Sequence, residues 1–296
     1  MKKLIVICGP TAVGKTSTSI ALAKHLNCEI ISCDSRQFFK EMSIGTAKPT
    51  IEEMDGIPHH FVGNLSIQEE YTAGRFEEEA IKKIAELHKT NEYVIMVGGS
   101  GLYVKAVVEG IDNIPGDSKI REELNLKLEN EGIEVLQNQL KELDEDHYKT
   151  MDIHNTQRLV RAIEVCLTTG QPYSSLRLNE KKNRDFETDL FCINMDRDKL
   201  YERINLRVDL MLESGLLDEV KSLEQYKHIN ALKTVGYQEF YDSFDGKHNL
   251  EEAVELVKRN SRRYAKRQLT WFKRMGGIEF LEKDEALNEL LNKYSK

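Results

Sequence analysis

The clearest chemical signal in the sequence is the segment GPTAVGKT at residues 9–16, which fits the pattern G-x-x-x-x-G-K-[ST] at every fixed position. In this pattern, backbone N–H groups of the loop and the N-terminus of the following helix surround phosphate oxygens. The Lys15 ammonium would neutralise the terminal phosphate, and the Thr16 hydroxyl would hold a Mg²⁺ ion. The sequence therefore predicts a phosphate-binding loop made of Gly9, Pro10, Thr11, Ala12, Val13, Gly14, Lys15 and Thr16.

Two further segments carry polar groups suited to chemistry near a phosphate. The sequence Asp-Ser-Arg-Gln at 34–37 follows one apolar run, and the glycine-rich segment 98–103, which contains Ser100, follows another. The carboxyl ends of parallel strands face the ligand crevice, where a carboxylate such as Asp34 can act as a base or orient a metal. A helix N-cap at Asp34 or Ser35 is the structural alternative.

The elements that must position these groups follow an alternating pattern. Short apolar runs typical of buried strands occur at 4–9, 29–34, 93–99, 190–196 and 278–284. Helical patterns separate the first three runs, at 16–25 and 71–89. This alternation predicts an α/β fold of the P-loop NTPase type, with a parallel sheet and helices on both faces.

About ninety residues separate the third and fourth runs, more than one crossover helix requires. The content of this segment is polar and helix-forming, as in KIREELNLKLENEGIEVLQNQLKEL. We therefore expect a helical insertion domain at 113–189 within a core domain formed by 1–112 and 190–296. Assignment of the last helix of the insertion to the core is the alternative.

Composition limits the class of protein. Of the 296 residues, 40% are hydrophobic and 31% are charged, and no apolar run approaches the ~20 residues that span a bilayer. The short apolar run near the N-terminus passes into a glycine-rich motif rather than a cleavage site, so we read it as a buried strand. The five cysteines lack zinc-ligand spacing, which favours buried, reduced thiols. We expect a cytoplasmic monomer with no membrane contact.

The distribution of charge singles out one segment. The net charge of −8 opposes indiscriminate binding of nucleic acids, so any such site must be a local basic patch. The run 258–274 carries eight basic residues and no acidic one. On charge alone such a run is more often a solvated helix face.

Aromatic and histidine side chains offer weaker signals. Trp271 and Phe272 lie within the basic run and could stack on nucleotides, but the helical pattern of their apolar neighbours favours a place in the core. His59 and His60 could suggest a metal pair. Adjacent residues of a strand point to opposite sides, so a structural role is favoured for both histidines.

Taken together and in order, the motifs resemble the tRNA dimethylallyltransferase family in its bacterial form. The segments that carry this resemblance are GPTAVGKT (9–16), DSRQFFKEMSIGTAKP (34–49), GIPHHF (56–61), YTAGRF (71–76), GGSGLY (98–103), QRLVRAIEV (157–165), RVDLMLESGLLDEV (207–220), TVGYQEF (234–240) and RRYAKRQLTWFKR (262–274). The family implies transfer of a dimethylallyl group from dimethylallyl diphosphate, with Mg²⁺, to the exocyclic N6 amine of the adenine next to the anticodon (position 37) of tRNA.

The resemblance also implies roles for individual residues. The diphosphate is held by Gly14, Lys15 and Thr16, with Ser100 and an arginine, for which Arg207 is the first choice and Arg203 the second. Asp34 receives the amine proton. Contacts with the tRNA, at its anticodon stem-loop, are implied for Asp34, Ser35, Arg36, Gln37, Ser100, Arg121, Gln157, Arg158, Leu159, Val160, Arg161, Gly236, Tyr237 and Gln238.

Two positions depart from the usual pattern of this family. Ser100 stands where threonine is common, which keeps the hydroxyl, and Phe39 stands where tyrosine is common, so no function is assigned to it. The alternatives from other classes are a small-molecule kinase or NTPase, an adenylate isopentenyltransferase acting on free adenosine nucleotides, and a non-catalytic RNA-binding module. The motifs beyond the loop do not match a kinase, and the insertion with the basic run argues against a free-nucleotide substrate.

Overall fold

The computed structural model describes residues 2–178 and 180–295, and the chain divides into two compact units. The core unit comprises Met1–Val108 and Asn183–Lys296, and the insertion unit comprises Glu109–Lys182. The insertion unit thus begins four residues before the expected position 113 and ends seven residues before 189. Its ends meet where the Lys182 N–H donates to the Glu109 carbonyl at 2.8 Å.

A six-stranded parallel sheet forms the centre of the core unit, with the strand order β3-β2-β4-β1-β5-β6. The strands are β1 (Lys3–Cys8), β2 (Ile30–Ser32), β3 (His59–His60), β4 (Tyr93–Gly98), β5 (Glu187–Asn194) and β6 (Ile278–Glu282). Five of them correspond to the apolar runs of the sequence. The two-residue β3 was not predicted, because it is too short to give a period.

Strand β5 begins earlier than its apolar run predicts. Residues Glu187–Asp189 extend it, pairing with Lys3–Ile5 of β1. Their charges have partners, since Asp189 accepts hydrogen bonds from Lys3 Nζ at 3.0 Å and from the Tyr294 hydroxyl at 2.5 Å. Backbone pairing with β1 and these side-chain contacts explain why the strand includes polar residues that the apolar run does not predict.

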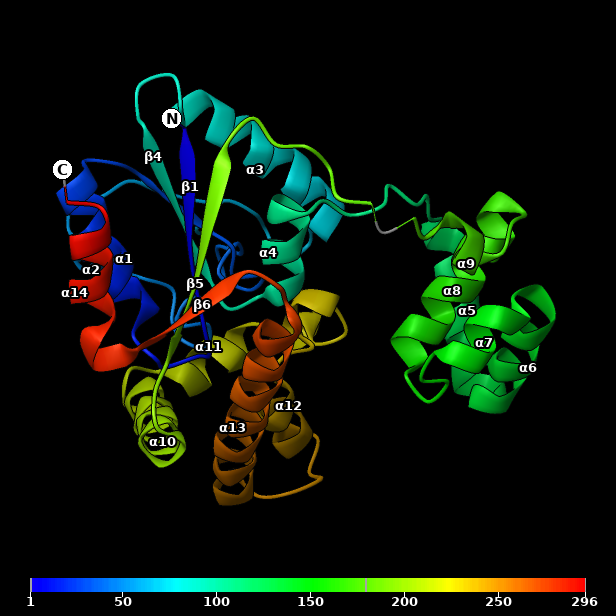
Figure 1. Cartoon of the computed structure of the whole chain (residues 1–296). Helices are drawn as coiled ribbons and strands as arrows, with labels where there is room; N and C mark the ends of the chain where they lie inside the picture. Colours follow the sequence, from blue (N-terminus) through cyan, green and yellow to red (C-terminus); the bar gives the residue numbers. More distant parts are fainter. Residues whose placement is uncertain (1, 179, 296) are drawn as a thin grey trace. The chain divides into compact units, whose positions relative to one another are not determined.

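Helices cover both faces of the sheet, as the sequence predicted (Figure 1). The helices of the core unit are α1 (Lys15–Leu26), α2 (Ile51–Met54), α3 (Ala73–Leu87), α4 (Gly101–Val108), α10 (Arg197–Glu213), α11 (Leu216–Ser222), α12 (Gln238–Phe244), α13 (Leu250–Arg274) and α14 (Lys283–Lys293), with 3₁₀ turns at Glu224–Tyr226 and Asn230–Leu232. Alternate residues of β1 face opposite ways: Leu4 and Val6 pack towards α3 and α4, and Ile5 and Ile7 towards α1 and α14. Burial on both sides explains the continuous apolar runs.

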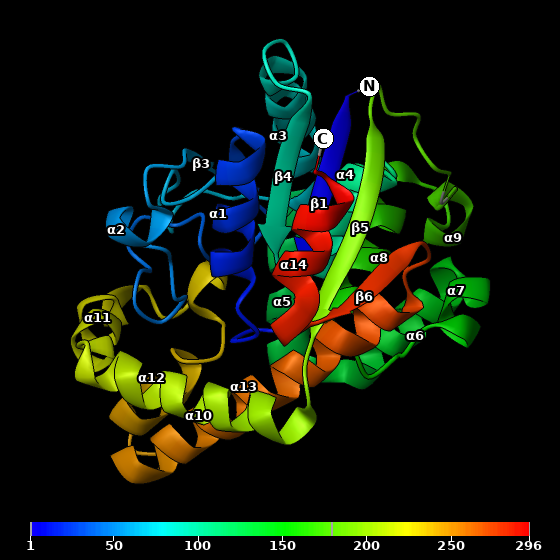
Figure 2. The same cartoon turned by 60° about the vertical axis from the view of Figure 1, so that its left-hand side comes forward.

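The longest helix, α13, contains the basic run. It begins with a capping box, in which Asn249 accepts from the Glu252 N–H and Glu252 accepts from the Asn249 N–H. One face is apolar and buried, and includes Ala253, Val257 and Phe272. Figure 2 shows α10 and α13 crossing near the carboxyl ends of the strands, the edge where parallel sheets bind ligands.

Within its described residues, the regular secondary structure of the insertion unit is entirely helical. They are α5 (Ser118–Glu131), α6 (Ile133–Leu143), α7 (Glu145–Thr150), α8 (Thr156–Thr169) and α9 (Tyr173–Leu176). Leucines from α5 and α6 and the apolar face of α8 form a separate core, with Leu136, Leu140 and Leu159 fully buried. This packing explains the amphipathic pattern of α6 and α8.

No helix in the described part of the chain is long and apolar enough to cross a bilayer. All five cysteines are buried and free, as the sequence predicted. Burial raises the pKa of Cys28 to about 12 and raises that of Cys33 further.

Candidate active site

The glycine-rich loop joins β1 to α1 at the carboxyl edge of the sheet. At Gly9, φ is +144° and an added Cβ would lie 2.5 Å from the Ile193 carbonyl oxygen, so only glycine fits there. Gly14, with φ at +98°, caps the N-terminus of α1. The first turn of α1 contains no acidic side chain and exposes Thr16. This arrangement leaves a helix N-terminus open to an anion.

Lys15 is half-buried in this loop. Its Nζ donates to the Pro10 carbonyl at 2.8 Å. Burial lowers the pKa of Lys15 to about 8, with a contribution in the same direction from Arg207, while Asp34 acts in the opposite direction. The three side chains therefore lie within electrostatic reach of one another. Lys15 forms no ion pair with the residues that the structure describes, and a bound diphosphate would supply one.

Two arginines on one face of α10 contact the loop. Arg203 donates from Nε to the Ala12 carbonyl at 2.9 Å, and Arg207 donates from Nη1 to Thr11 Oγ1 at 3.2 Å. Arg207 is the more buried of the two, and burial lowers its pKa while Asp34 opposes that shift. Both arginines are thus placed to reach an anion in the loop, and Arg207 stays our first choice.

Asp34 and Ser100, predicted from separate motifs, lie at neighbouring strand ends. The Ser100 hydroxyl accepts from the Ser35 N–H at 3.0 Å and donates to Ser35 Oγ at 3.1 Å. Asp34 Oδ1 accepts from the Arg36 N–H at 3.1 Å within a turn. No α-helix follows Asp34 directly, so the alternative of a helix N-cap is wrong.

The neighbours of Asp34 are hydrogen-bonded to backbone carbonyls, both within their own loop and in the 3₁₀ turn Asn230–Leu232. Gln37 Nε2 donates to the carbonyls of Thr46 and Ala47 at 3.2 and 3.0 Å. Arg36 donates to the Asn230 carbonyl at 3.0 Å. These bonds hold the loop that presents Asp34, and contacts of Arg36 and Gln37 with a nucleotide stay predictions.

Helix α13 reaches the site with side chains that the sequence did not single out. Gln268 bridges the two loops, accepting from the Thr11 N–H and donating to the Gly99 carbonyl, both at 2.9 Å. Tyr264 lies close to Asp34 and Ser100, and its pKa is raised to about 12, chiefly by burial. The sequence did not predict a role in the site for these residues, because a run of basic residues on a helix usually indicates a solvent-exposed face.

The prediction for the aromatic pair was half correct. Phe272 is fully buried, as expected, but Trp271 is 37% exposed. A Cβ added at Gly101 would lie 2.2 Å from Trp271 Cδ1. The indole therefore packs against the segment 98–103 after β4, next to Ser100. Successive residues of a helix diverge by about 100°, so one of the pair faces the core and the other the loop.

The segment Gly236–Gln238, predicted to contact tRNA, has only one exposed side chain. Tyr237 is fully buried and its hydroxyl donates to Glu219 Oε1 at 2.6 Å. The Gly236 N–H is bonded to Glu239, whereas Gln238 is exposed. Burial excludes a side-chain contact from Tyr237, so a contact through Gln238 or the backbone stays a prediction.

The predicted tRNA contacts of the insertion unit also include both buried and exposed side chains. Leu159 and Val160 belong to its core, and their side chains are unavailable to a ligand. Gln157 and Arg158 are exposed, while Arg161 is half-buried. Their contacts with tRNA stay predictions.

Two arginines of the insertion unit converge on one buried carboxylate. Arg121 Nη2 and Arg161 Nη1 lie 3.0 and 3.1 Å from Oε1 of Glu164, which is fully buried. The Asp117 N–H donates to the same oxygen at 2.9 Å. These bonds orient both arginines and partly occupy their guanidinium groups.

The two histidines of β3 have separate partners. His60 Nε2 lies 2.7 Å from Glu29 Oε2, and His59 Nδ1 lies 2.7 Å from the Ile57 carbonyl. These contacts agree with a structural role for the pair, which stays a prediction. Phe39, which replaces a common tyrosine, is buried in the core.

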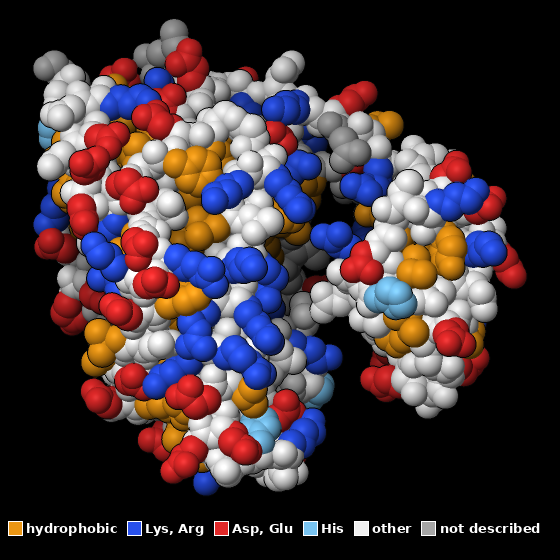
Figure 3. All heavy atoms as spheres, turned by 60° about the horizontal axis from the view of Figure 1, so that its bottom comes forward, with side chains coloured by type: hydrophobic (Ala, Val, Ile, Leu, Met, Phe, Trp, Pro, Cys, Tyr) orange, Lys and Arg blue, Asp and Glu red, His pale blue; other side chains and the backbone are white. Residues whose placement is uncertain are grey.

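Lys and Arg side chains gather on the face of the core unit shown in Figure 3, which brings forward the end that carries α10 and α13. Among the basic residues of α13, Arg259, Arg263, Lys266, Arg267, Lys273 and Arg274 are exposed. Lys258 instead pairs with Asp209 at 2.7 Å, and Arg262 donates to Asn205 at 2.6 Å. The exposed members of this set form the basic face of α13.

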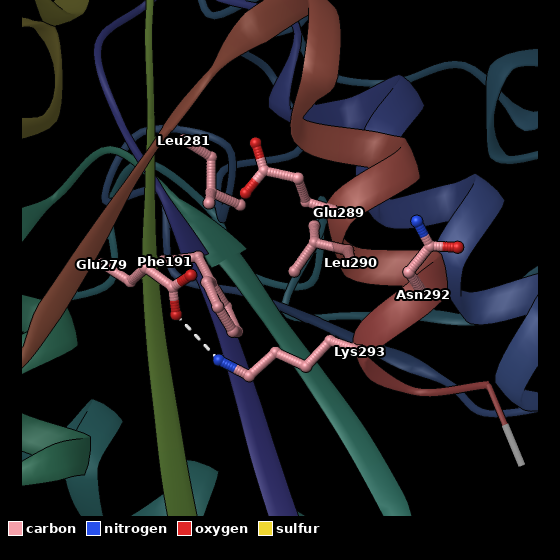
Figure 4. Close-up of a pocket in the computed structure, with 7 residues that line it drawn as sticks. All are labelled: Phe191, Glu279, Leu281, Glu289, Leu290, Asn292 and Lys293. Atoms are coloured by element: carbon pink, nitrogen blue, oxygen red, sulfur yellow. Dashed lines mark hydrogen bonds and ion pairs between the residues drawn. The ribbon is translucent and has the colours of Figure 1, made fainter.

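A hollow between β5, β6 and α14 lies apart from the glycine-rich loop (Figure 4). Its lining residues are Phe191, Glu279, Leu281, Glu289, Leu290, Asn292 and Lys293. Glu279 and Lys293 form an ion pair there at 2.7 Å, and Lys293 Nζ lies 4.6 Å from the centre of the Phe191 ring. Two of its polar lining residues are thus paired with each other.

The parallel sheet, the phosphate-binding loop and the adjacent carboxylate define a P-loop enzyme of the α/β class. A family model described as IPP transferase matches residues 37–275. A tRNA dimethylallyltransferase from Flavobacterium johnsoniae is 49% identical, over 99% of this chain and 97% of the relative. One from Christiangramia forsetii is 50% identical, over 95% and 94% of the two chains.

Two solved structures are also similar. A tRNA isopentenylpyrophosphate transferase from Bacillus halodurans has a TM-score of 0.73 and 39% identity, covering 99% of this chain and 95% of that one. A eukaryotic dimethylallyltransferase acting on tRNA has a TM-score of 0.77 and 32% identity, covering 96% and 74%. The chain belongs to the IPP transferase family. This confirms the resemblance and the fold class predicted from the motifs.

Proposed function

We propose that this chain transfers a dimethylallyl group from dimethylallyl diphosphate to the N6 amine of the adenine that follows the anticodon of tRNA. The observation that carries the proposal is the placement of Asp34 within electrostatic reach of both Lys15 and Arg207. A carboxylate thus lies beside a cationic phosphate cradle. That combination suits a reaction in which a diphosphate leaves and an amine loses a proton.

The residues can be assigned to the steps of this reaction. The N6 nitrogen attacks C1 of the dimethylallyl group, the C–O bond breaks, and the diphosphate departs with the bonding electrons. Lys15, Arg207 and the N-terminus of α1 stabilise the charge that develops on the leaving group. Asp34 accepts the proton that the amine loses.

The chain fits a Mg²⁺ ion held mainly by its substrate. Among the described residues, no three His, Cys, Asp or Glu side chains are grouped as metal ligands, and Thr16 makes no side-chain hydrogen bond. Magnesium commonly keeps several waters and takes one or two protein ligands together with phosphate oxygens. The Thr16 hydroxyl would be its protein ligand, and the ion would screen the diphosphate charge.

The acceptor must enter a crevice at the edge of the sheet, so its target base has to leave the stack of the anticodon loop. The basic face of α13 supplies local positive charge for the RNA backbone, despite the net charge of −8. We propose that this face and the insertion unit both contact the anticodon stem-loop. We also propose a cytoplasmic location, where tRNA is available.

The direct test is incubation of the purified protein with Mg²⁺, dimethylallyl diphosphate and an unmodified anticodon stem-loop, followed by mass analysis of the nucleosides. We expect one isopentenyl group on the adenine next to the anticodon. A stem-loop with guanine at this position is the control and should stay unmodified. Turnover of ATP without prenylated RNA would favour the kinase instead, and prenylation of free adenosine nucleotides alone would favour the nucleotide-specific enzyme.

A further inference from the structure

One buried amide joins the two loops of the proposed active site. Gln268 lies on α13 and is only 6% exposed. Its Oε1 accepts from the Thr11 N–H and its Nε2 donates to the Gly99 carbonyl, each at 2.9 Å. The acceptor and one donor of the amide are therefore bonded to backbone groups of different loops.

The bonds of Gln268 belong to a longer chain of contacts. On one side, the hydroxyl of Thr11 accepts from Arg207, the arginine assigned to the diphosphate. On the other side, Gly99 precedes Ser100, whose hydroxyl accepts from the Ser35 N–H next to Asp34. Gln268 thus connects the loop that would hold the diphosphate with the loops that would face the amine.

The fit of α13 against this region is tight. A Cβ added at Gly99 would lie 2.2 Å from Gln268 Nε2, and one at Gly101 would lie 2.2 Å from Trp271 Cδ1. Residues 268 and 271 are three positions apart and therefore share a face of the helix. The two glycines that flank Ser100 allow this face to approach the backbone closely.

We propose that Gln268 is a positioning residue for prenyl transfer, which sets the spacing between the donor loop and the acceptor loops. This inference rests on the proposed function. Gln268 acts through Thr11 and Gly99, because its oxygen and one N–H are already engaged there. A displacement of about 1 Å between reacting groups can cost roughly 10²-fold in rate, so a link of this kind affects turnover more than binding.

The first variant is Gln268→Met, which keeps the length of the side chain and removes both hydrogen bonds. We expect kcat to fall roughly tenfold to a hundredfold, with KM for dimethylallyl diphosphate and for the stem-loop within about twofold of the wild type. Thermal unfolding establishes that the variant is folded. The matched control is Gln225→Met, an exposed glutamine of the core unit to which no role in the site is assigned, and it should leave kcat unchanged.

The second variant, Gln268→Glu, tests the two hydrogen bonds separately from packing. A protonated carboxyl has one donor and one acceptor, as the amide needs, whereas a carboxylate would place a negative oxygen against the Gly99 carbonyl. The ratio of its kcat to that of the wild type should therefore rise as pH falls. The corresponding ratio for Gln268→Met should stay flat. Lys15, Arg207 and Tyr264 are present in every enzyme compared, so the ratio for Gln268→Met is the control for pH effects that do not depend on a carboxyl group at residue 268.

Gly99→Ala provides an independent route, since the added Cβ displaces the amide. It should lower kcat in the same way, and combining it with Gln268→Met should add little, because both changes break one link. A wild-type kcat for Gln268→Met, a loss confined to KM, or a flat pH ratio for Gln268→Glu would overturn the proposal. If Gln268→Met does not fold, Gly99→Ala and Gln268→Glu decide. Absence of prenylated RNA from the wild type would instead contradict the proposed function.

Discussion

Tyr237 donates a 2.6 Å hydrogen bond to Oε1 of Glu219, and the same carboxylate accepts three backbone N–H bonds, from Ser43 and Ile44 at Oε2 and from Gly45 at Oε1. A Cβ at Gly45 would lie 2.6 Å from the Tyr237 ring. One carboxylate therefore fixes the loop that follows Asp34 onto α11. The pKa of Tyr237 is raised, first by burial and then by Glu219.

We expect Tyr237→Phe to lower the free energy of unfolding by about 1–2 kcal/mol, since it removes one hydrogen bond to a charged group. Glu219→Gln should cost more, because an amide nitrogen would face backbone N–H donors. Denaturation in urea measures both, with Glu213→Gln, an exposed position on α10, as the control. Equal stability of Glu219→Gln and the wild type would contradict the anchoring role.

Asp34→Asn separates the chemistry of this residue from its place in the turn. The asparagine can still accept from the Arg36 N–H, which Asp34 bonds at 3.1 Å, but it is a very weak base. We expect kcat to fall about 10²–10⁴-fold with little change in tRNA affinity. Single-turnover kinetics and a binding titration measure the two effects. Normal turnover with weakened tRNA binding would make Asp34 a positioning residue.

The lowered pKa of Lys15 predicts how donor binding depends on pH. Below about 8, Lys15 of the free enzyme is charged, and above it the proton is lost. Bound diphosphate favours the charged form, so affinity should be constant below pH 8 and fall above it, approaching tenfold per pH unit. Titration of the enzyme with dimethylallyl diphosphate across this range measures the effect.

The matched variant for this prediction is Lys15→Ala. It should bind the donor weakly at every pH, without the fall above pH 8, and bind tRNA almost as the wild type does. Arg207 stays charged throughout, so it does not contribute a second step. A similar decline in Lys15→Ala would assign the pH dependence to another group.

The basic face of α13 predicts a salt effect on tRNA binding. Neutralising Arg263 and Lys266, both exposed, should flatten the plot of log affinity against log salt by roughly 0.7–0.9 for each RNA phosphate that the variant no longer neutralises. Turnover at saturating tRNA should change little, because phosphate contacts position the substrate. The control removes the same charge elsewhere, with Lys82→Ala and Lys89→Ala on exposed positions of α3 and just after it.

The contrasting result is equally specific. If the salt slope for tRNA stays unchanged while the requirement for dimethylallyl diphosphate rises, the cluster serves the donor. Arginines close to a diphosphate pocket make this alternative physically reasonable.

The sequence by itself determined the approximate positions of five strands, the phosphate-binding loop and the family. These depend on local patterns: apolar runs mark strands buried on both faces, and glycines at fixed spacing mark a loop with φ angles that other residues avoid. Lys15 and Thr16 could be named for the same reason. The two-residue β3 and the polar start of β5 were missed, because a ladder with neighbouring strands, rather than hydrophobicity, creates them.

Only the tertiary structure decided which side chains meet at the site and which are buried. Gln268 contacts Thr11 across 257 positions of sequence, and no local pattern shows that a polar residue of a basic helix faces inward. The same packing buries Tyr237 and leaves Trp271 against Gly101. The helical period predicts which residues share a face of a helix. Which part of the protein that face contacts depends on how α13 and α10 pack at the end of the sheet.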